Sequence, residues 1–263
     1  NVKNISERSV VWDEYQKFWD GKIFMPRAVF EPLSGAKVLP ATRCSIDGFE
    51  LQVEHMITFN TTDRVIIHGE SGAGKSTLVD ALFGFVESSF GILAHQIPII
   101  HTQDIVGRIR NGRTLTDLFS GDTNIDRIEH CLELVDLSGW YKRVTKEGNG
   151  LDTKISSWSG GEKNRFALAA SLARLMRKKE EWESEHKEPN AQILVLDEAT
   201  KGVHHSLAYK ILSRIMEAFP GTLIIVITHL ERGWEQPYWT KKINVSPITD
   251  DDDVAIGGTV TLC

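Results

Sequence analysis

The fold of this chain is decided by the stretch Gly69-Glu70-Ser71-Gly72-Ala73-Gly74-Lys75-Ser76-Thr77. It matches GxxxxGK[ST] in full, with an apolar run before it and a helical pattern after it. Glycines let backbone N–H groups approach phosphate oxygens, and the N-terminus of the following helix adds positive potential. The Lys75 ammonium supplies charge to the β- and γ-phosphates, and the Ser76 hydroxyl supplies a ligand to Mg²⁺. We therefore expect a nucleoside triphosphate and Mg²⁺ at this turn.

A second motif follows the apolar run at 193–196, which predicts a buried strand that ends in two carboxylates, Asp197 and Glu198. The sheet can place Asp197 beside Mg²⁺, directly or through water. Glu198 then faces the γ-phosphate and can polarise the attacking water. An acidic pair at the end of a strand is a weak signal alone. Together with the phosphate-binding turn it predicts a site for phosphoryl transfer to water.

Composition places the chain among ordinary globular proteins. Of its 263 residues, 41% are hydrophobic and 25% are charged, which excludes a disordered or fibrous chain. The net charge of −6 argues against a generally basic nucleic-acid binder, although it leaves a local basic patch open. The apolar runs are shorter than the ~20 residues of a membrane-spanning helix. Three distant cysteines, Cys44, Cys131 and Cys263, predict reduced thiols and a cytosolic setting.

Apolar runs alternate with helical patterns along most of the chain. The expected strands lie at 46–68, 91–100, 193–196 and 223–228, and the expected helices begin near Lys75, fill much of 104–185 and span 206–218. This alternation predicts an α/β fold with a mainly parallel sheet and an antiparallel β region near the N-terminus. It also predicts a helical subdomain, at about 104–185, inserted into the core. We expect an N-terminal extension at 1–45 and one main domain at 46–263.

Three further segments carry less specific patterns. In the N-terminal extension, apolar residues between Val11 and Trp19 recur at helical spacing, which fits packing on the main body or docking on a partner. The charged stretch 177–190 predicts an exposed helical extension or loop rather than a binding element. The acidic run 250–253 predicts a solvated turn, with a Ca²⁺ site as the alternative.

A third motif, Trp158-Ser159-Gly160-Gly161-Glu162-Lys163, opens a helical pattern and resembles the signature of ATP-binding-cassette (ABC) ATPases. Its small residues at a helix N-terminus also suit an anion on physical grounds alone. The resemblance covers about 46–260 and implies a P-loop NTPase that binds and hydrolyses ATP with Mg²⁺. It also implies a head-to-tail dimer, in which Ser159, Gly160 and Gly161 cap the γ-phosphate held by the opposite subunit.

Two more landmarks follow the order of the ABC family. Gln96, after a strand expected at 91–95, resembles the Q-loop glutamine, which contacts Mg²⁺ and water. His229, after the apolar run 223–228, resembles the histidine that contacts the γ-phosphate. The resemblance thus implies a catalytic set of Lys75, Gln96, Glu198 and His229, and a metal set of Ser76, Gln96 and Asp197. The phosphates of ATP lie on the turn itself, 69–77.

Weaker matches point to the exporter-type members of the family. They are Gly150-Leu151-Asp152-Thr153-Lys154-Ile155 before the signature, Leu115-Thr116-Asp117-Leu118-Phe119, and the tail Lys242-Ile243-Asn244-Val245. The resemblance implies a membrane domain as partner, or one attached to the same chain, and a place at the cytoplasmic face of a membrane.

The chain departs from the family pattern at several positions. Trp158 replaces the usual Leu, and His204 replaces the aspartate of the D-loop. The signature lies farther than usual from Asp197 because of the charged stretch 177–190. No aromatic residue stands where the family stacks adenine, and Phe49 is the nearest candidate.

Three functions remain open at this stage. The leading one is an ATP-driven motor for a membrane transporter. The second is a non-transport ABC ATPase that acts on nucleic acid or a macromolecular assembly, which the missing coiled coil and the acidic charge disfavour. The third is a nucleotide-gated module with weak hydrolysis, which the altered D-loop favours.

Overall fold

The computed structural model describes most of the chain from β1 onward. The described residues are 37–39, 42–46, 48–55, 57–83, 98–102, 114–119, 122–139, 141–142, 158–186, 192–229, 233–250 and 253–263. The aromatic pattern between Val11 and Trp19, the exporter-like stretch 150–155 and Gln96 therefore lie outside the described residues.

Within this part of the chain, eight strands form the main sheet in the order β2-β3-β10-β9-β5-β8-β7-β6, while β1 and β4 form an antiparallel pair. The bounds are β1 (Lys37–Leu39), β2 (Thr42–Ile46), β3 (Phe49–Val53), β4 (Ile57–Phe59), β5 (Arg64–Gly69), β6 (Ile99–His101), β7 (Ile193–Asp197), β8 (Leu223–Ile227), β9 (Lys241–Thr249) and β10 (Ala255–Leu262). Only the pairs β2–β3 and β9–β10 of the main sheet are antiparallel. The predicted α/β fold, with its mainly parallel sheet and an antiparallel region near the N-terminus, is confirmed.

The central strands are apolar on both faces. In β5, Val65 and Ile67 join one buried cluster, whereas Ile66 joins the other. The same alternation divides β7 and β8 between the two clusters. Successive side chains of a strand point to opposite faces, so both faces of these parallel strands must be covered. This explains the uninterrupted apolar runs in the sequence.

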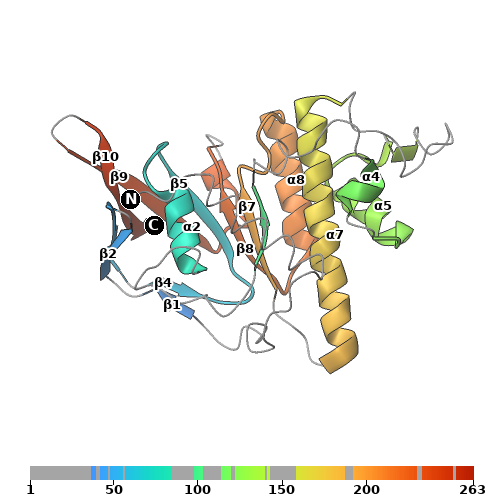
Figure 1. Ribbon diagram of the computed structural model, residues 1–263, viewed down its shortest axis with the longest axis horizontal. Helices are drawn as coiled ribbons and strands as arrows, with labels where there is room; N and C mark the ends of the chain where they lie inside the picture. Colours follow the sequence, from blue (N-terminus) through green and yellow to red (C-terminus); the bar gives the residue numbers. More distant parts are fainter. Residues whose placement is uncertain are drawn as a thin grey trace.

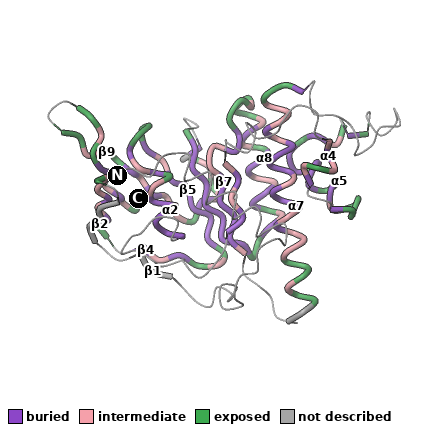
Figure 2. Tube along the Cα trace, viewed as in Figure 1, coloured by how far each residue is buried: buried purple, intermediate pink, exposed green. Residues whose placement is uncertain are grey.

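Helices cover the two faces (Figure 1). The helix bounds are α2 (Lys75–Leu82), α4 (Leu115–Leu118), α5 (Ile125–Leu134), α7 (Gly160–His186) and α8 (His205–Ala218), with a short 3₁₀ helix η4 (Gly233–Glu235). Helix α2 packs in one cluster, and α5, α7 and α8 contribute to the other. Figure 1 shows α7 and α8 between the sheet and the small helices α4 and α5. Burial decreases along the second half of α7 (Figure 2).

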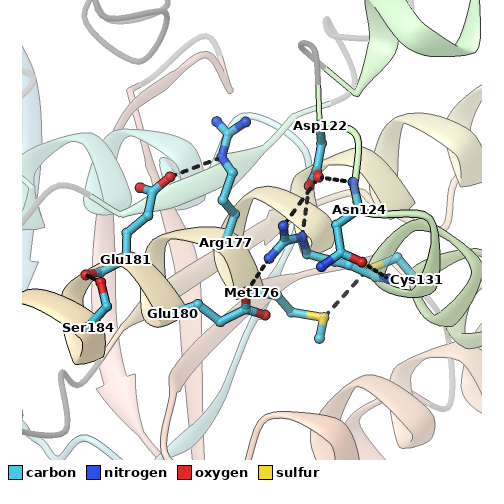
Figure 3. Close-up of polar contacts among 9 residues, drawn as sticks. Asp122, Asn124, Cys131, Met176, Arg177, Glu180, Glu181 and Ser184 are labelled. Atoms are coloured by element: carbon cyan, nitrogen blue, oxygen red, sulfur yellow. Dashed lines mark hydrogen bonds and ion pairs between the residues drawn. The ribbon is translucent and has the colours of Figure 1, made fainter.

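A charged cluster holds the start of α5 against α7 (Figure 3). Arg127 Nε lies 2.8 Å from Asp122 Oδ2, and another nitrogen of the same guanidinium pairs with Glu180 on α7. Farther along α5, the Cys131 thiol lies 3.6 Å from Met176 Sδ. Asp122 is buried, so pairing with an arginine compensates the loss of its hydration. These contacts fix α5 on the outer face of α7.

Several expected elements match the structure, and one is described only in part. The helix predicted at 206–218 is α8, and the charged stretch 177–190 is helical up to His186. The strand expected at 91–100 is found only in its last residues, as β6 at Ile99–His101, since 91–97 lie outside the described residues. Among the described helices, none is both long and apolar enough to span a membrane.

Candidate functional site

The phosphate-binding turn lies between β5 and α2, and its glycines hold backbone conformations that other residues rarely adopt. Gly69, Gly72 and Gly74 have φ angles of 149°, 82° and 95°. Gly69 is also needed for space, because a Cβ there would lie 2.0 Å from the carbonyl oxygen of Val245 on the neighbouring strand β9. The turn can therefore form only with glycine at its first position. It delivers the chain to the N-terminus of α2, where an anion is favoured.

Lys75 is the first residue of α2, and its side chain folds back over the turn. Its Nζ donates hydrogen bonds to the carbonyl oxygens of Gly69, at 2.9 Å, and Glu70, at 2.6 Å. Burial lowers the pKa of Lys75, while the nearby carboxylates of Glu198 and Asp197 act to raise it. The ammonium is thus held at the mouth of the turn, where it can meet phosphate oxygens.

Ser76 and Asp197 meet across the site. Ser76 Oγ donates to Asp197 Oδ2 at 3.2 Å, which joins the first turn of α2 to the carboxyl end of β7. A hydroxyl oxygen and a carboxylate oxygen at this separation are the hard ligands that suit Mg²⁺, with phosphate oxygens and water completing its shell. The residues present therefore fit the metal that the sequence predicts.

Glu198 follows β7, and each oxygen of its carboxylate has a partner. Its Oε1 lies 3.1 Å from His229 Nε2, and its Oε2 lies 2.9 Å from Lys201 Nζ. Burial, with Lys75 next in effect, lowers the pKa of His229, so the imidazole is neutral near pH 7. Because a carboxylate only accepts hydrogen bonds, the proton of that neutral ring sits on Nε2. The backbone of Glu198 has φ 49° and its N–H donates to Ile227 on β8.

The signature stretch forms the start of α7 as a capping box. The Glu162 backbone N–H donates to Ser159 Oγ at 3.2 Å, and the Ser159 N–H donates to Glu162 Oε2 at 2.9 Å. This reciprocal pair satisfies two of the free donors at the helix N-terminus. Trp158 is buried and stacks on Phe166, with ring centroids 4.1 Å apart, so it fills an apolar position as a leucine would.

Two departures from the family pattern have a clear place in the structure. His204 precedes α8 directly and is exposed, with its Nδ1 3.0 Å from Ser206 Oγ. Phe49 is half-buried, and its ring packs on the phosphate-binding turn, where a Cβ on Gly74 would lie 2.5 Å from Phe49 Cε1.

The acidic run includes Asp250, whose carboxylate accepts the N–H of Val254 in the turn between β9 and β10.

The predicted residues fall into two groups in the structure. Lys75, Ser76, Asp197, Glu198 and His229 come together at the carboxyl ends of β5, β7 and β8. Ser159, Gly160 and Gly161 lie apart from them in sequence, at the start of α7.

Gln96 and the strand expected before it lie outside the described residues, and β6 begins after them at Ile99. Sequence analysis missed Lys201, because nothing in its local pattern shows the contact with Glu198.

Comparisons with known proteins agree with this geometry. A family model described as ABC transporter matches residues 54–177. A putative export ATP-binding/permease protein of Rickettsia bellii is 29% identical over 195 residues, which cover 68% of this chain and 31% of that protein. The Microcin-J25 export ATP-binding/permease protein of Escherichia coli is 32% identical over 179 residues, which cover 61% of this chain and 28% of that protein.

Among solved structures, a bacterial Atm1-family ABC exporter with ATP bound shares the fold, with a TM-score of 0.57 and 20% identity. The match covers 91% of this chain and 42% of that one. This chain thus spans about a third of the length of the export proteins that it resembles. Together with the phosphate-binding turn and the site around it, these matches show an ABC-type ATPase domain, which binds and hydrolyses ATP.

Proposed function

We propose that this ATPase domain is the motor of a membrane transporter and that two copies hydrolyse ATP while closed head to tail. The observation that carries the proposal is the cluster of Lys75, Ser76, Asp197, Glu198 and His229 at one edge of the sheet. The similarity to export ATP-binding/permease proteins supports export, a membrane domain as partner, and a position at the cytoplasmic face of the membrane.

In this proposal the turn and Lys75 bind the phosphates. Backbone N–H groups of 69–77 face the phosphate oxygens, and the Lys75 ammonium exchanges its two carbonyl contacts for the β- and γ-phosphates. Ser76 and Asp197 would hold Mg²⁺, which would neutralise charge that develops on the phosphates. Catalysis then depends mainly on positioning and electrostatic stabilisation.

Glu198 is the proposed base that orients and polarises the attacking water. His229 keeps its neutral Nε2–H toward Glu198 in the described structure, and near the γ-phosphate the same N–H can donate to a phosphate oxygen. Lys201 must leave Glu198 Oε2 for water to approach that atom. We expect this exchange when the second subunit and ATP enter the site.

We propose a second glutamine for the role predicted for Gln96. In a parallel sheet the ligand-binding edge lies at the carboxyl ends of the strands. β6 is parallel to β7 and ends at His101, so a residue after His101 in the sequence is better placed for this role than Gln96. We therefore assign the Q-loop role to Gln103, two residues beyond β6. Gln96 and Gln103 both lie outside the described residues.

The dimer contact is proposed at the start of α7. Ser159 and Gly160 are exposed at a capped helix N-terminus, which leaves the helix end open to a phosphate of the opposite subunit. Two sites would then form per dimer, each from the phosphate-binding turn of one copy and the signature of the other.

The test is ATP hydrolysis measured against protein concentration, with the size of the protein measured in ATP. We expect turnover that rises more than linearly with concentration and an ATP-dependent dimer. Lys75→Ala should lose nucleotide binding, and Glu198→Gln should bind ATP and dimerise but hydrolyse it poorly. Glu217→Gln, the same exchange on the exposed side of α8, is the matched control.

Three results would redirect the proposal. Full activity in Glu198→Gln would refute the assigned base. ATP binding and dimerisation without turnover in the unchanged protein would favour a nucleotide-gated module. The contacts of Lys201 and His229 with the two oxygens of the Glu198 carboxylate also fit such a module. Salt-dependent stimulation of turnover by DNA or RNA would favour a non-transport ATPase.

A further inference from the structure

A chain of buried polar side chains runs from strand β6 to helix α7. His101, the last residue of β6, is fully buried between two residues of α7. Its Nε2 lies 3.2 Å from Asn164 Oδ1, and its Nδ1 lies 3.3 Å from Ser171 Oγ. The two residues before it, Ile99 and Ile100, are apolar, so an imidazole at the end of this strand is a polar exception in an apolar core.

Asn164 continues the chain to the loop that carries Glu198. Its Nδ2 donates to the carbonyl oxygen of Ala199 at 2.8 Å and to that of Lys201 at 3.1 Å. These two carbonyls belong to the turn directly after Glu198. One amide group therefore ties the turn to the first helical turns of α7, only a few residues beyond the signature.

The partners of Asn164 determine which nitrogen of His101 carries the proton. Asn164 must face the two carbonyls with its NH₂ group, so its oxygen must face His101. That oxygen only accepts, so the His101 proton sits on Nε2. Nδ1 lies 3.3 Å from Ser171 Oγ, whose one proton also has the carbonyl oxygen of Ala167, at 3.1 Å, within reach. Burial lowers the pKa of His101 to about 4, so the ring keeps this single neutral form at neutral pH. The His101 Nε2–H thus meets the Asn164 oxygen and favours the orientation in which the amide NH₂ faces the two carbonyls.

A backbone contact supports the same loop from the same helix. A Cβ on Gly161 would lie 2.8 Å from the carbonyl oxygen of Gly202, so the start of α7 packs closely on the loop. The loop needs outside support, because Glu198 at its start has the left-handed φ of 49° that non-glycine residues rarely adopt.

We propose that His101 is a positioning residue, which orients the Asn164 amide so that Asn164 holds the Glu198 loop in place for catalysis. This inference rests on the proposed function of Glu198 as the base. It also provides a physical link between the strand that precedes Gln103, the signature helix and the base. Movement of α7 on closure would carry the Glu198 loop with it through two hydrogen bonds and one backbone contact.

The test uses substitutions in the full chain that distinguish the contact of His101 Nε2 from the contact of Nδ1. His101→Gln can place an amide N–H where Nε2–H is, and so keep the donor to Asn164. His101→Asn reaches only the Nδ1 position and loses that donor. His101→Leu loses both contacts. Ile99→Ala, a buried truncation in the same strand with no contact in the polar chain, is the control for lost core packing.

Two readouts are measured for each variant. One is the exchange rate of the Lys201 and Val203 backbone amides, which donate to Glu198 and Thr200 in this loop. The other is kcat, together with the affinity for ATP in Mg²⁺-free buffer. We expect His101→Leu and His101→Asn to raise amide exchange in the loop and lower kcat by about 10- to 100-fold. ATP affinity should change little, because the phosphate-binding turn is untouched.

His101→Gln should recover most of the loop protection and most of kcat. If His101→Gln behaves as His101→Leu does, or if His101→Leu matches Ile99→Ala in both readouts, His101 does not position Asn164. The exchange readout needs no ATPase activity. It therefore still decides the role of His101 if the unchanged protein proves unable to hydrolyse ATP.

Discussion

Gly69 and Gly72 lie in the same phosphate-binding turn, but different constraints act on them. At Gly69 a Cβ would lie 2.0 Å from the Val245 carbonyl oxygen, which is fixed in the β5–β9 ladder. At Gly72 the nearest side-chain atom would be 3.9 Å from a new Cβ, so only the φ of 82° opposes another residue. A comparison of the two positions therefore distinguishes the cost of a left-handed backbone, at Gly72, from the added cost of a steric clash, at Gly69.

The expected outcome is a large difference between two alanine variants. Gly72→Ala should lower the free energy of unfolding by about 1–2 kcal/mol, the cost of a left-handed residue with a side chain. Gly69→Ala should lower it by about 3 kcal/mol or more, since strands β5 and β9 must also separate. Urea unfolding of both variants measures this. Equal losses would show that the approach of Val245 is not limiting.

A second residue-scale prediction concerns the pH dependence of stability. Burial lowers the pKa of His101 to about 4, against 6.5 for a histidine in the unfolded chain. Between these two values the unfolded state binds the proton and the folded state does not, so stability rises with pH. The free energy of unfolding should therefore fall by about 3 kcal/mol as the pH decreases from 6.5 toward 4, because only the unfolded state gains the proton in this range.

Unfolding free energies measured from pH 7 to pH 4 test this titration. His101→Gln carries no titrating group there, so its stability curve should be flatter than that of the unchanged protein by about the same amount. Parallel curves for the two proteins would show that His101 does not keep its depressed pKa in solution.

At the scale of elements, Arg64 fastens the end of helix α8 to the sheet. Its guanidinium, on the first residue of β5, donates to the carbonyl oxygens of Phe219 at 2.6 Å, Met216 at 3.3 Å and Thr222. Met216 lies in the last turn of α8, and Phe219 and Thr222 follow the helix, so these acceptors lie at its C-terminal end. Arg64 is only 7% exposed, so water cannot replace it there. One planar fork thus serves several carbonyls at once.

Replacing the Arg64 guanidinium should destabilise the protein, and the loss should be larger for methionine than for lysine. Arg64→Lys keeps the charge but not the planar set of donors, and should lower the free energy of unfolding by about 1–2 kcal/mol. Arg64→Met leaves the carbonyls unsatisfied and should cost about 3 kcal/mol or more. Urea unfolding measures both losses. Arg214→Met, at a partly exposed arginine of α8 that pairs with Asp136, is the comparison. A lysine variant as stable as the unchanged protein would contradict the geometric argument.

The elements that could be predicted are those with long patterns. The helices α5 and α8 and the strands β7 and β8 follow from apolar periodicity that is independent of their neighbours. The strand β6 is short, and its limits are set by pairing with β7 rather than by its own residues. The strand expected at 91–95, on which the assignment of Gln96 depends, lies outside the described residues. His101 and Lys201 were missed because their partners are distant in the sequence or set by a turn.

At the scale of the whole molecule, the motif order along the chain determines which residues meet. The phosphate-binding turn, the acidic pair and His229 follow β5, β7 and β8, which are neighbours in the sheet. Parallel strands bring their carboxyl ends to one edge, so this part of the site follows from the sequence. The parallel pairing of β3 with the final strand β10 does not, since it joins residues about 200 positions apart without a shared motif.

The proposed head-to-tail dimer can be tested by mixing two inactive variants. Lys75→Ala disables the phosphate-binding turn, and Ser159→Arg blocks the exposed start of α7. Ser159 is a better choice than Gly161, where a new Cβ would meet the Gly202 carbonyl and disturb the Glu198 loop. In a mixed dimer one site combines the intact turn of the Ser159→Arg copy with the intact signature of the Lys75→Ala copy. The other site carries both defects.

Random pairing makes half of the dimers mixed, with one intact site in each, so a 1:1 mixture should recover roughly a quarter of the unchanged rate if the two sites act independently. Recovery should rise with total protein concentration, since the intact site exists only in the dimer. A site built within one copy would give no recovery, because each variant would carry its own defect. Recovery well below a quarter, but above zero, would show that an intact site turns over more slowly beside a defective one. The two sites would then communicate although His204 stands in the D-loop.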